Sequence, residues 1–249
     1  MLARANAVSV FSSITTMFSN QDANGKVLVE NDQVKEEWRK YMEKLLNENT
    51  WDNTTTCEKV EGPYELIRRD EILKALRMMK KDKAAGPTGN VSEMFTAEED
   101  WSVEWLTSLC NLIVAQGRIP DDWRSIILLP VFKGKGDPME CGPYRAIKLL
   151  KHAMKVIERV FERRIREKVK INAMQFGFMP GKGTTDAIFT VPVRQMQEKC
   201  GCRRKKVYFT FVNLEKAFDT VPREVTRWAL RKAGVDEWLV KRCMRVHRR

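Results

Sequence analysis

The segment with the clearest chemical potential is an apolar run that ends in polar residues. Residues 207–212 are rich in Val, Tyr and Phe, and Asn213, Glu215 and Asp219 follow them. Polar side chains at the point where a strand meets a turn are common in catalytic and binding sites. The same pattern is also typical of a core strand that leaves its sheet into solvent. The residues alone therefore predict a strand over 207–214 and leave both interpretations of its exit open.

A glycine-rich basic turn is the second candidate. Lys133 and Lys135 alternate with Gly134 and Gly136, directly after the apolar run 126–132. Lysine side chains on such a turn can contact phosphate oxygens, and they can equally be solvated turn residues. The residues alone predict a basic turn and leave this choice open.

The charge of the chain favours a polyanionic partner. Lys and Arg number 45 against 33 Asp and Glu, which gives a net charge of +12. Between residues 145 and 170, ten basic residues stand against three glutamates. Clustered basic residues release counterions from nucleic-acid phosphates, so nucleic acid is favoured over a membrane. A basic excess can also merely keep a protein in solution.

The cysteines indicate neither a zinc site nor a disulfide framework. The six cysteines form no Cys-x-x-Cys pair, and the sequence has two histidines. Free thiols in a reducing compartment are therefore expected. No apolar run reaches the ~18 residues of a membrane span, and no secretion signal is recognised. We expect an intracellular protein, nuclear or cytoplasmic.

Hydrophobic spacing predicts helices separated by a few strands. Helices are expected over 32–46, from Asp70 onward, around 105–113, over 154–169, and between Pro222 and Gly234. The apolar runs at 126–132 and 207–214 indicate strands, the first of them buried. Regular βαβ alternation is missing, so the order of elements favours an α+β fold.

Five short motifs stand in order along the chain. They are the Lys-Ala-Ala-Gly-Pro-Thr-Gly loop at 83–89, Trp123 with 129–136, the block 144–150, the block 175–178 with 181–188, and the segment 211–219. Together they resemble the reverse transcriptases of non-LTR retrotransposons, especially the RTE/BovB type, over about residues 24–245. One such motif would be a weak signal, whereas five in order are highly specific.

The resemblance implies the fingers and the beginning of the palm of a right-hand polymerase. We expect a disordered leader at 1–22, a helical extension at 23–80, a fingers-like region at 81–205 and the start of the palm at 206–249. The sequence reaches Arg249 before the family's aspartate-pair motif, so we expect an incomplete, truncated domain.

The resemblance also implies roles for individual residues. The incoming dNTP would be contacted by Lys133 and Arg145, and Phe218 would exclude ribonucleotides by crowding the sugar. Gln175 and Gly177 would lie near the RNA template and the DNA primer. The nucleic-acid backbone would meet Arg159, Arg163, Arg166 and Lys170, which are placed at helical spacing. Asp186 and Asp219 are better interpreted as capping or ion-pairing residues.

One position departs from the family in a way that affects catalysis. Two Mg²⁺ ions held by carboxylates would drive the family's reaction, and one carboxylate comes from the position that Asn213 occupies here. A neutral amide is a weak Mg²⁺ ligand, and the sequence contains no Tyr/Phe-Ala-Asp-Asp run. Metal binding at Asn213 is therefore expected to be degenerate. The segment Val191-Pro192-Val193 is a smaller departure that could disturb a helix.

Three hypotheses follow for function. The first is an inactive remnant of an RNA-directed DNA polymerase. The second is a non-catalytic RNA- or DNA-binding module that uses the basic fingers surface. The third is a working polymerase whose missing ligands come from another chain. The sequence leaves the oligomeric state open.

Overall fold

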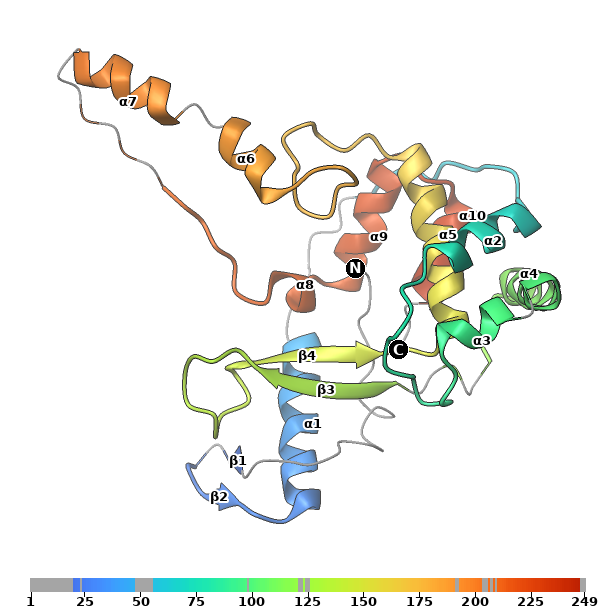
Figure 1. Cartoon of the computed structure of the whole chain (residues 1–249), viewed down its shortest axis with the longest axis horizontal. Helices are drawn as coiled ribbons and strands as arrows, with labels where there is room; N and C mark the ends of the chain where they lie inside the picture. Colours follow the sequence, from blue (N-terminus) through green and yellow to red (C-terminus); the bar gives the residue numbers. More distant parts are fainter. Residues whose placement is uncertain are drawn as a thin grey trace. The chain divides into compact units, whose positions relative to one another are not determined.

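The computed structural model (Figure 1) describes residues 20–22, 24–47, 56–97, 99–120, 123, 126–190, 193–202, 206, 208 and 210–246. Its elements are β1 (Asn20–Gln21), β2 (Val27–Leu28), α1 (Asn31–Asn47), α2 (Arg69–Arg77), α3 (Ser92–Ala97), α4 (Glu99–Gln116), β3 (Ile127–Phe132), β4 (Tyr144–Leu149), α5 (His152–Lys168), α6 (Thr184–Thr190), α7 (Val193–Cys202), α8 (Ala217–Thr220), α9 (Arg223–Lys232) and α10 (Glu237–Val246). This mixture of helices and short antiparallel strands confirms the α+β class.

The chain forms two compact units, which are described separately. The first contains residues 1–168 and 217–249, and the second contains residues 169–216. These units do not follow the expected boundaries at 80/81 and 205/206, so the division into extension, fingers and palm stays a prediction. Within the part described, no helix is long and apolar enough to cross a membrane.

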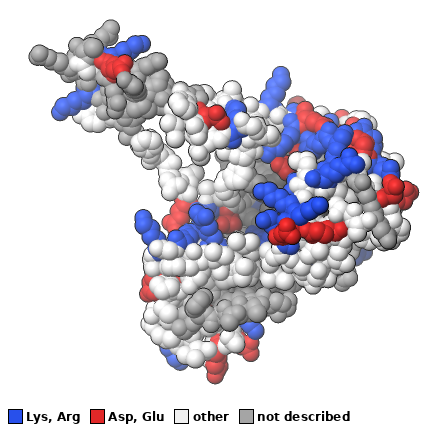
Figure 2. Space-filling view, in the orientation of Figure 1, with Lys and Arg blue, Asp and Glu red and all other residues white. Residues whose placement is uncertain are grey.

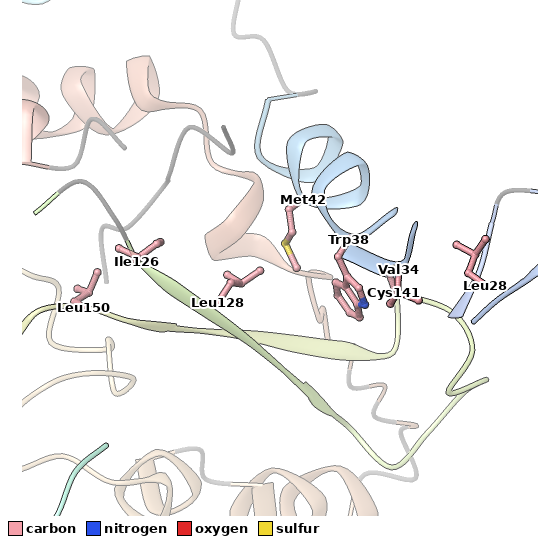
Figure 3. Packing of buried hydrophobic residues seen from close by; sticks show 8 residues of the cluster. All are labelled: Leu28, Val34, Trp38, Met42, Ile126, Leu128, Cys141 and Leu150. Atoms are coloured by element: carbon pink, nitrogen blue, oxygen red, sulfur yellow. The ribbon is translucent and has the colours of Figure 1, made fainter. Parts of the chain in front are cut away.

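An antiparallel hairpin and one helix make up one layer of the first unit. β3 pairs with β4 from Ile127 opposite Leu149 to Phe132 opposite Tyr144. Side chains of α1 pack against this hairpin and enclose a cluster of apolar residues (Figure 3): Leu28, Val34, Trp38, Met42, Ile126, Leu128, Cys141 and Leu150. The predicted helix over 32–46 is confirmed, because the residues at its 3.6-residue spacing form this contact.

The hairpin buries one face only, which corrects the prediction of a buried strand. Leu128 is buried, whereas Leu129 and Val131 are about two-fifths exposed, at 40% and 41%. Successive side chains of a strand point to opposite faces, and α1 covers only the face that carries Leu128. The strand is therefore half-buried although its sequence is continuously apolar.

A second layer of the first unit consists of helices. α2 packs against α4 and α5, and α10 packs against α5 and α9. The largest fully buried side chains of these helices include Ile72, Leu76, Leu106, Met154, Ile157, Phe161 and Leu239. The predicted helices over 154–169 and after Pro222 are confirmed as α5 and α9, and Pro222 occupies the N-cap position of α9.

The start of α2 differs from the prediction that Asp70 is its N-cap. The N-cap residue is Arg68, and the side chain of Glu71 accepts a hydrogen bond from the Arg68 backbone N–H at 2.9 Å. The Asp70 carboxylate instead accepts hydrogen bonds from the side chains of Arg68 and Lys74, at 3.0 and 3.1 Å. Glu71, at the third position of the helix, therefore accepts the hydrogen bond at the start of α2, in place of the cap expected from Asp70.

The expected leader at 1–22 reaches too far. Residues 1–19 lie outside the described residues, but Asn20–Gln21 form β1 and pair with β2. The Gln21 backbone N–H donates to the Met139 carbonyl at 2.9 Å, and the Asn20 amide donates to the Cys141 sulfur at 3.0 Å. Both contacts join this short strand to the loop between β3 and β4, so residues 20–21 are ordered by the hairpin.

The second unit contains α6 and α7, with loops before and after them. The predicted loop over 175–183 is confirmed as a series of turns that ends where α6 begins. The predicted strand over 207–214 is wrong for the residues described there. Residues 208 and 210–214 form no strand, and Phe211 and Val212 are 92% and 81% exposed. A strand needs a partner for its backbone groups, and none of the described residues pairs with this segment. Val191 and Pro192 lie outside the described residues.

Candidate nucleotide and nucleic-acid interface

Two predicted nucleotide-binding residues lie on the same face of the β3–β4 hairpin. Arg145 stands opposite Val131 in the register, and the Lys133 backbone N–H donates to the Pro143 carbonyl at 3.1 Å, which continues the ladder. Lys133 is two residues beyond Val131, so the alternation of side chains places it on the face of Val131 and Arg145. Both basic residues are exposed. The hairpin therefore presents two exposed cations on one face.

The opposite face of the hairpin is held in place by aromatic contacts. The Tyr144 ring lies edge-on to Trp38 of α1, with centroids 5.2 Å apart, and 5.3 Å from Phe132. The Tyr144 hydroxyl donates to the Pro138 carbonyl at 2.7 Å, within the loop that connects the strands. These contacts of Tyr144 hold β4 in place on one face of the hairpin, and Arg145 is exposed on the other face.

The loop 83–89 docks onto the backbone between β4 and α5. Gly86 is buried, and a Cβ at this position would lie 2.5 Å from the Leu150 carbonyl oxygen, which is closer than any side chain can approach. The Gly89 N–H donates to the Gly86 carbonyl at 3.0 Å and closes a turn. A glycine is thus required at position 86 because two backbone segments meet there.

Arg163 and Arg166 form ion pairs with glutamates of the same helix, α5. Arg163 pairs with Glu167 at 3.0 Å and Arg166 pairs with Glu162 at 2.8 Å, both along the helix surface. Arg159 is partly exposed on the same helix. Figure 2 shows that basic and acidic side chains alternate over the region of α5 and α9, so the predicted basic face is a mixed surface.

Three basic residues between positions 145 and 170 lie away from the exposed side of α5, and of these only Lys170 was predicted to contact nucleic acid. Lys151 is buried, and Lys170 lies beyond the end of α5 at Lys168 and in the second unit. Arg164 is buried on the opposite side of α5 and pairs with Glu71 of α2. The role of Arg164 was not predicted because it stands among arginines, although its spacing from Ile157 and Phe161 places it on their apolar face.

Gln175 and Gly177, the predicted template-contacting residues, belong to a loop with several internal hydrogen bonds. The Gln175 side chain donates to the Gly177 carbonyl at 2.9 Å. Lys182 donates to the Gln175 carbonyl at 3.2 Å, and its ammonium lies 4.9 Å from the centre of the Phe176 ring. Gln175 and Gly177 are thus exposed residues of a loop that its own hydrogen bonds stabilise.

A helix cap follows this loop. The Asp186 carboxylate accepts a hydrogen bond from the Gly183 N–H at 2.6 Å, immediately before α6 begins. This confirms that Asp186 has a capping role. It also fixes the end of the loop that begins at Gln175.

The structure brings the remaining candidates to exposed positions. Asn213 lies in the second unit, and Phe218 lies in α8 of the first unit with 63% of its surface exposed. α8 packs against α1. The backbone between Asn213 and α8 turns at 215–216, where Lys216 has a φ of 47°, in the left-handed region that non-glycine residues rarely adopt.

The side chain of Asn213 is a poor ligand for the Mg²⁺ ions of a two-metal centre. Mg²⁺ requires hard oxygen ligands and is usually held by carboxylates, whereas Asn213 offers a neutral carbonyl oxygen. Among the described residues, no three or more His, Cys, Asp or Glu side chains are grouped so that they could hold a metal ion. The side chains at this position therefore do not match the carboxylates that the family's reaction requires.

The cysteines found in the described region agree with the prediction of free thiols. Cys57, Cys110, Cys141, Cys200 and Cys243 are all unpaired with one another. Burial raises the pKa of Cys110 to about 12, so its thiol stays protonated and unreactive at neutral pH.

The second half of the chain is similar to a known protein family. Residues 133–249 match the family described as reverse transcriptase (RNA-dependent DNA polymerase). They begin at Lys133 and include Arg145, α5 and Asn213. Residues 133–249 are therefore similar to reverse transcriptases.

Relatives from transposable elements extend the match. The chain is 29% identical over 163 residues to the Retrovirus-related Pol polyprotein from type-1 retrotransposable element R1 of Bradysia coprophila, which covers 62% of this chain and 15% of the relative. It is 25% identical over 182 residues to the Probable RNA-directed DNA polymerase from transposon BS of Drosophila melanogaster, covering 70% and 19%. These relatives confirm the resemblance to non-LTR retrotransposon reverse transcriptases. The chain spans less than a fifth of the length of either relative.

Proposed function

We propose that this chain carries nucleotide- and nucleic-acid-contacting surfaces of a reverse transcriptase and does not itself join nucleotides. In this proposal residues 81–205 correspond to the fingers and residues 206–249 to the start of the palm. RNA template, DNA primer and dNTP are the expected partners. The match of residues 133–249 to the reverse transcriptase family supports the assignment.

The observation that carries the proposal is the placement of Lys133 and Arg145 on one open face of the hairpin. A guanidinium can bind two phosphate oxygens at once, and an ammonium adds a mobile point charge. The exposed side chains of Val131 and Ile147 lie on the same face, since both share the alternation of Arg145. The two cations would bind the triphosphate of a nucleotide, and the apolar surface beside them would contact its nucleoside.

The proposed lack of catalysis rests on Asn213. Replacing an anionic metal ligand with a neutral amide should cost several kcal/mol of transition-state stabilisation in a two-metal reaction. At ~1.4 kcal/mol for each factor of ten, the rate would fall at least about a hundredfold.

Binding of a fluorescent dNTP, followed by anisotropy, tests the nucleotide site. We expect Arg145→Ala and Lys133→Ala each to weaken binding by about tenfold or more, because each removes charge-assisted hydrogen bonds. Arg77→Ala is the control, since Arg77 is an exposed arginine in the last turn of α2 and outside the hairpin. Equal affinities for Arg145→Ala and Arg77→Ala would contradict the proposal.

A non-catalytic nucleic-acid-binding module is the second candidate. It is favoured by Arg159, Arg163 and Arg166, which are at least partly exposed on α5. This function needs no metal centre and would persist with Asn213 in place. The salt dependence of RNA and DNA binding distinguishes it from the first candidate, because phosphate contacts govern that dependence.

A further inference from the structure

Helix α4 is apolar on two opposite faces. One face is buried in the first unit, and α2 and α3 pack against this helix: Ser102, Val103, Leu106, Cys110, Ile113 and Val114. The other face is exposed and consists of Trp101, Trp105, Ser108, Leu112 and Ala115, which we call the α4 seam. A continuous exposed apolar stripe on a helix commonly marks a contact surface. The seam is therefore an apolar surface that a partner would be expected to cover.

The seam has the spacing of a helix–helix contact. Its residues follow one another at intervals of four, three, four and three positions, which is the repeat of a coiled-coil interface. Trp101 and Trp105 are 63% and 42% exposed, and Leu112 is 51% exposed. The two indole rings are stacked with centroids 6.1 Å apart and an angle of 7° between their planes. Stacking fixes both rings on the helix before a partner binds, which lowers the entropic cost of association.

We propose that the α4 seam is the contact surface of a homodimer, in which α4 of one copy packs antiparallel against α4 of a second copy. A two-fold axis beside Ser108 would bring Ser108 of each copy face to face. Trp101 would then lie opposite Ala115, and Trp105 opposite Leu112. Large side chains meet smaller ones in this register, so the same surface is complementary to itself, as a two-fold interface requires.

The charges at the two ends of α4 favour the antiparallel arrangement. Glu104 is exposed near its first turn, and the exposed Asp100 already pairs with Arg69 of α2. Near its last residues, Arg242 donates to the Ala115 carbonyl and Arg245 to the Gly117 carbonyl, each at 3.4 Å. Antiparallel pairing brings the acidic end of one copy beside the basic end of the other. Parallel pairing would instead place like charges together.

Bases can stack on exposed aromatic rings, but the charges around the α4 seam disfavour nucleic acid as its partner. α4 contains no Lys or Arg, and acidic residues flank the tryptophans. A polyanion would be repelled at the place where it would have to stack. The seam thus differs in chemistry from the cationic face of the hairpin.

Sedimentation of the full 249-residue chain tests the dimer. The seam is small for a stable interface, so we expect dissociation on the order of micromolar. Leu112→Glu should give a monomer at concentrations where the parent chain is dimeric. Leu66→Glu should remain dimeric, because Leu66 is 60% exposed and lies outside α4. A parent chain that is monomeric up to about 100 μM, or equal dimerisation of both variants, would overturn the proposal.

Cross-linking tests the register without disturbing the seam by a charge. Ser108→Cys should form a disulfide between copies under mild oxidation, since the two Cβ atoms would meet at the axis. Gln116→Cys should not, because an antiparallel partner places Asp100 and not Gln116 opposite this position. Cross-linking of Gln116→Cys as efficiently as Ser108→Cys, or of neither above the parent chain, would contradict the arrangement.

Discussion

Arg164 of α5 and Glu71 of α2 form a buried, bidentate ion pair. The Arg164 Nε and Nη2 atoms donate to the two Glu71 carboxylate oxygens at 2.8 and 2.7 Å. The same guanidinium donates to the carbonyls of Glu65 and Leu66 at 3.0 and 2.7 Å, and it lies 5.7 Å from the centre of the Trp238 ring. One side chain thus joins α5, α2, α10 and the segment before α2.

We expect Arg164→Ala to lower the free energy of unfolding by about 3–5 kcal/mol, because it leaves Glu71 buried without its partner. Chemical denaturation followed by circular dichroism measures the loss. Arg163→Ala is the matched control, since Arg163 is an exposed arginine on the same helix with a solvent-exposed partner, and it should change stability little. A similar effect of both substitutions would show that the buried pair has no special role.

Acid should destabilise the contact between α9 and α10. Glu237 is buried and accepts two hydrogen bonds from Arg231 at 2.8 and 2.7 Å, which hold its pKa below the ordinary value although burial acts in the opposite direction. A carboxylate with a lowered folded-state pKa stabilises the fold above its unfolded pKa, about 4.3, and loses this contribution as the pH falls through the folded value. We expect the free energy of unfolding to fall below about pH 5. The decline should be shallower in Glu237→Gln, and an unchanged slope would contradict this assignment.

Gly86→Ala should detach the loop 83–89 from the junction of β4 and α5. The added methyl would lie 2.5 Å from the Leu150 carbonyl oxygen, and backbone atoms cannot move aside as a flexible side chain can. A cost of about 1–3 kcal/mol is expected, together with faster amide exchange in the loop. Gly142→Ala provides the control because a Cβ there meets nothing within 4 Å. Equal stabilities of the two variants would exclude the docking role of Gly86.

The exposed arginines of α5 should contribute to nucleic-acid binding. Replacing Arg159, Arg163 and Arg166 with Ala should weaken RNA binding uniformly across sequences. It should also flatten the slope of log affinity against log salt by about one unit for each phosphate that is no longer neutralised. The control replaces Lys35, Lys40 and Lys44 of α1, which removes the same charge from another surface. Equal weakening in the two triple variants would mean that only net charge matters.

The elements that could be predicted from the sequence are those with local signals. α1 and α5 follow from apolar spacing, α9 from the placement of Pro222 and Gly234, and β3 from its apolar run. β4 was not predicted as a strand, because Arg145 and Lys148 interrupt its apolar residues and its pairing with β3 depends on the tertiary fold. The prediction of a strand at 207–214 is wrong for the opposite reason. Its composition favours a strand, but no described residue pairs with it.

The candidate site was predictable as a set of residues but not as an arrangement. Lys133 and Arg145 could be named from motifs, yet only the register of the hairpin places them on one face. The exposed ion pairs of Arg163 with Glu167 and of Arg166 with Glu162 join residues four apart and could have been inferred from the sequence. The burial of Arg164 depends on Glu71, 93 positions away, and has no local signal beyond its helical spacing.

Primer extension by the Asn213→Asp variant tests the central claim most directly. The variant restores one carboxylate, but a single carboxylate supplies too little negative charge to hold two Mg²⁺ ions close together. On a primed RNA template with Mg²⁺ and dNTPs, we expect the parent chain and the variant to bind the labelled dNTP, and neither to extend the primer above background. Extension by Asn213→Asp that is abolished by EDTA and by the additional change Arg145→Ala would contradict the account, because it would show a working polymerase with one repaired ligand.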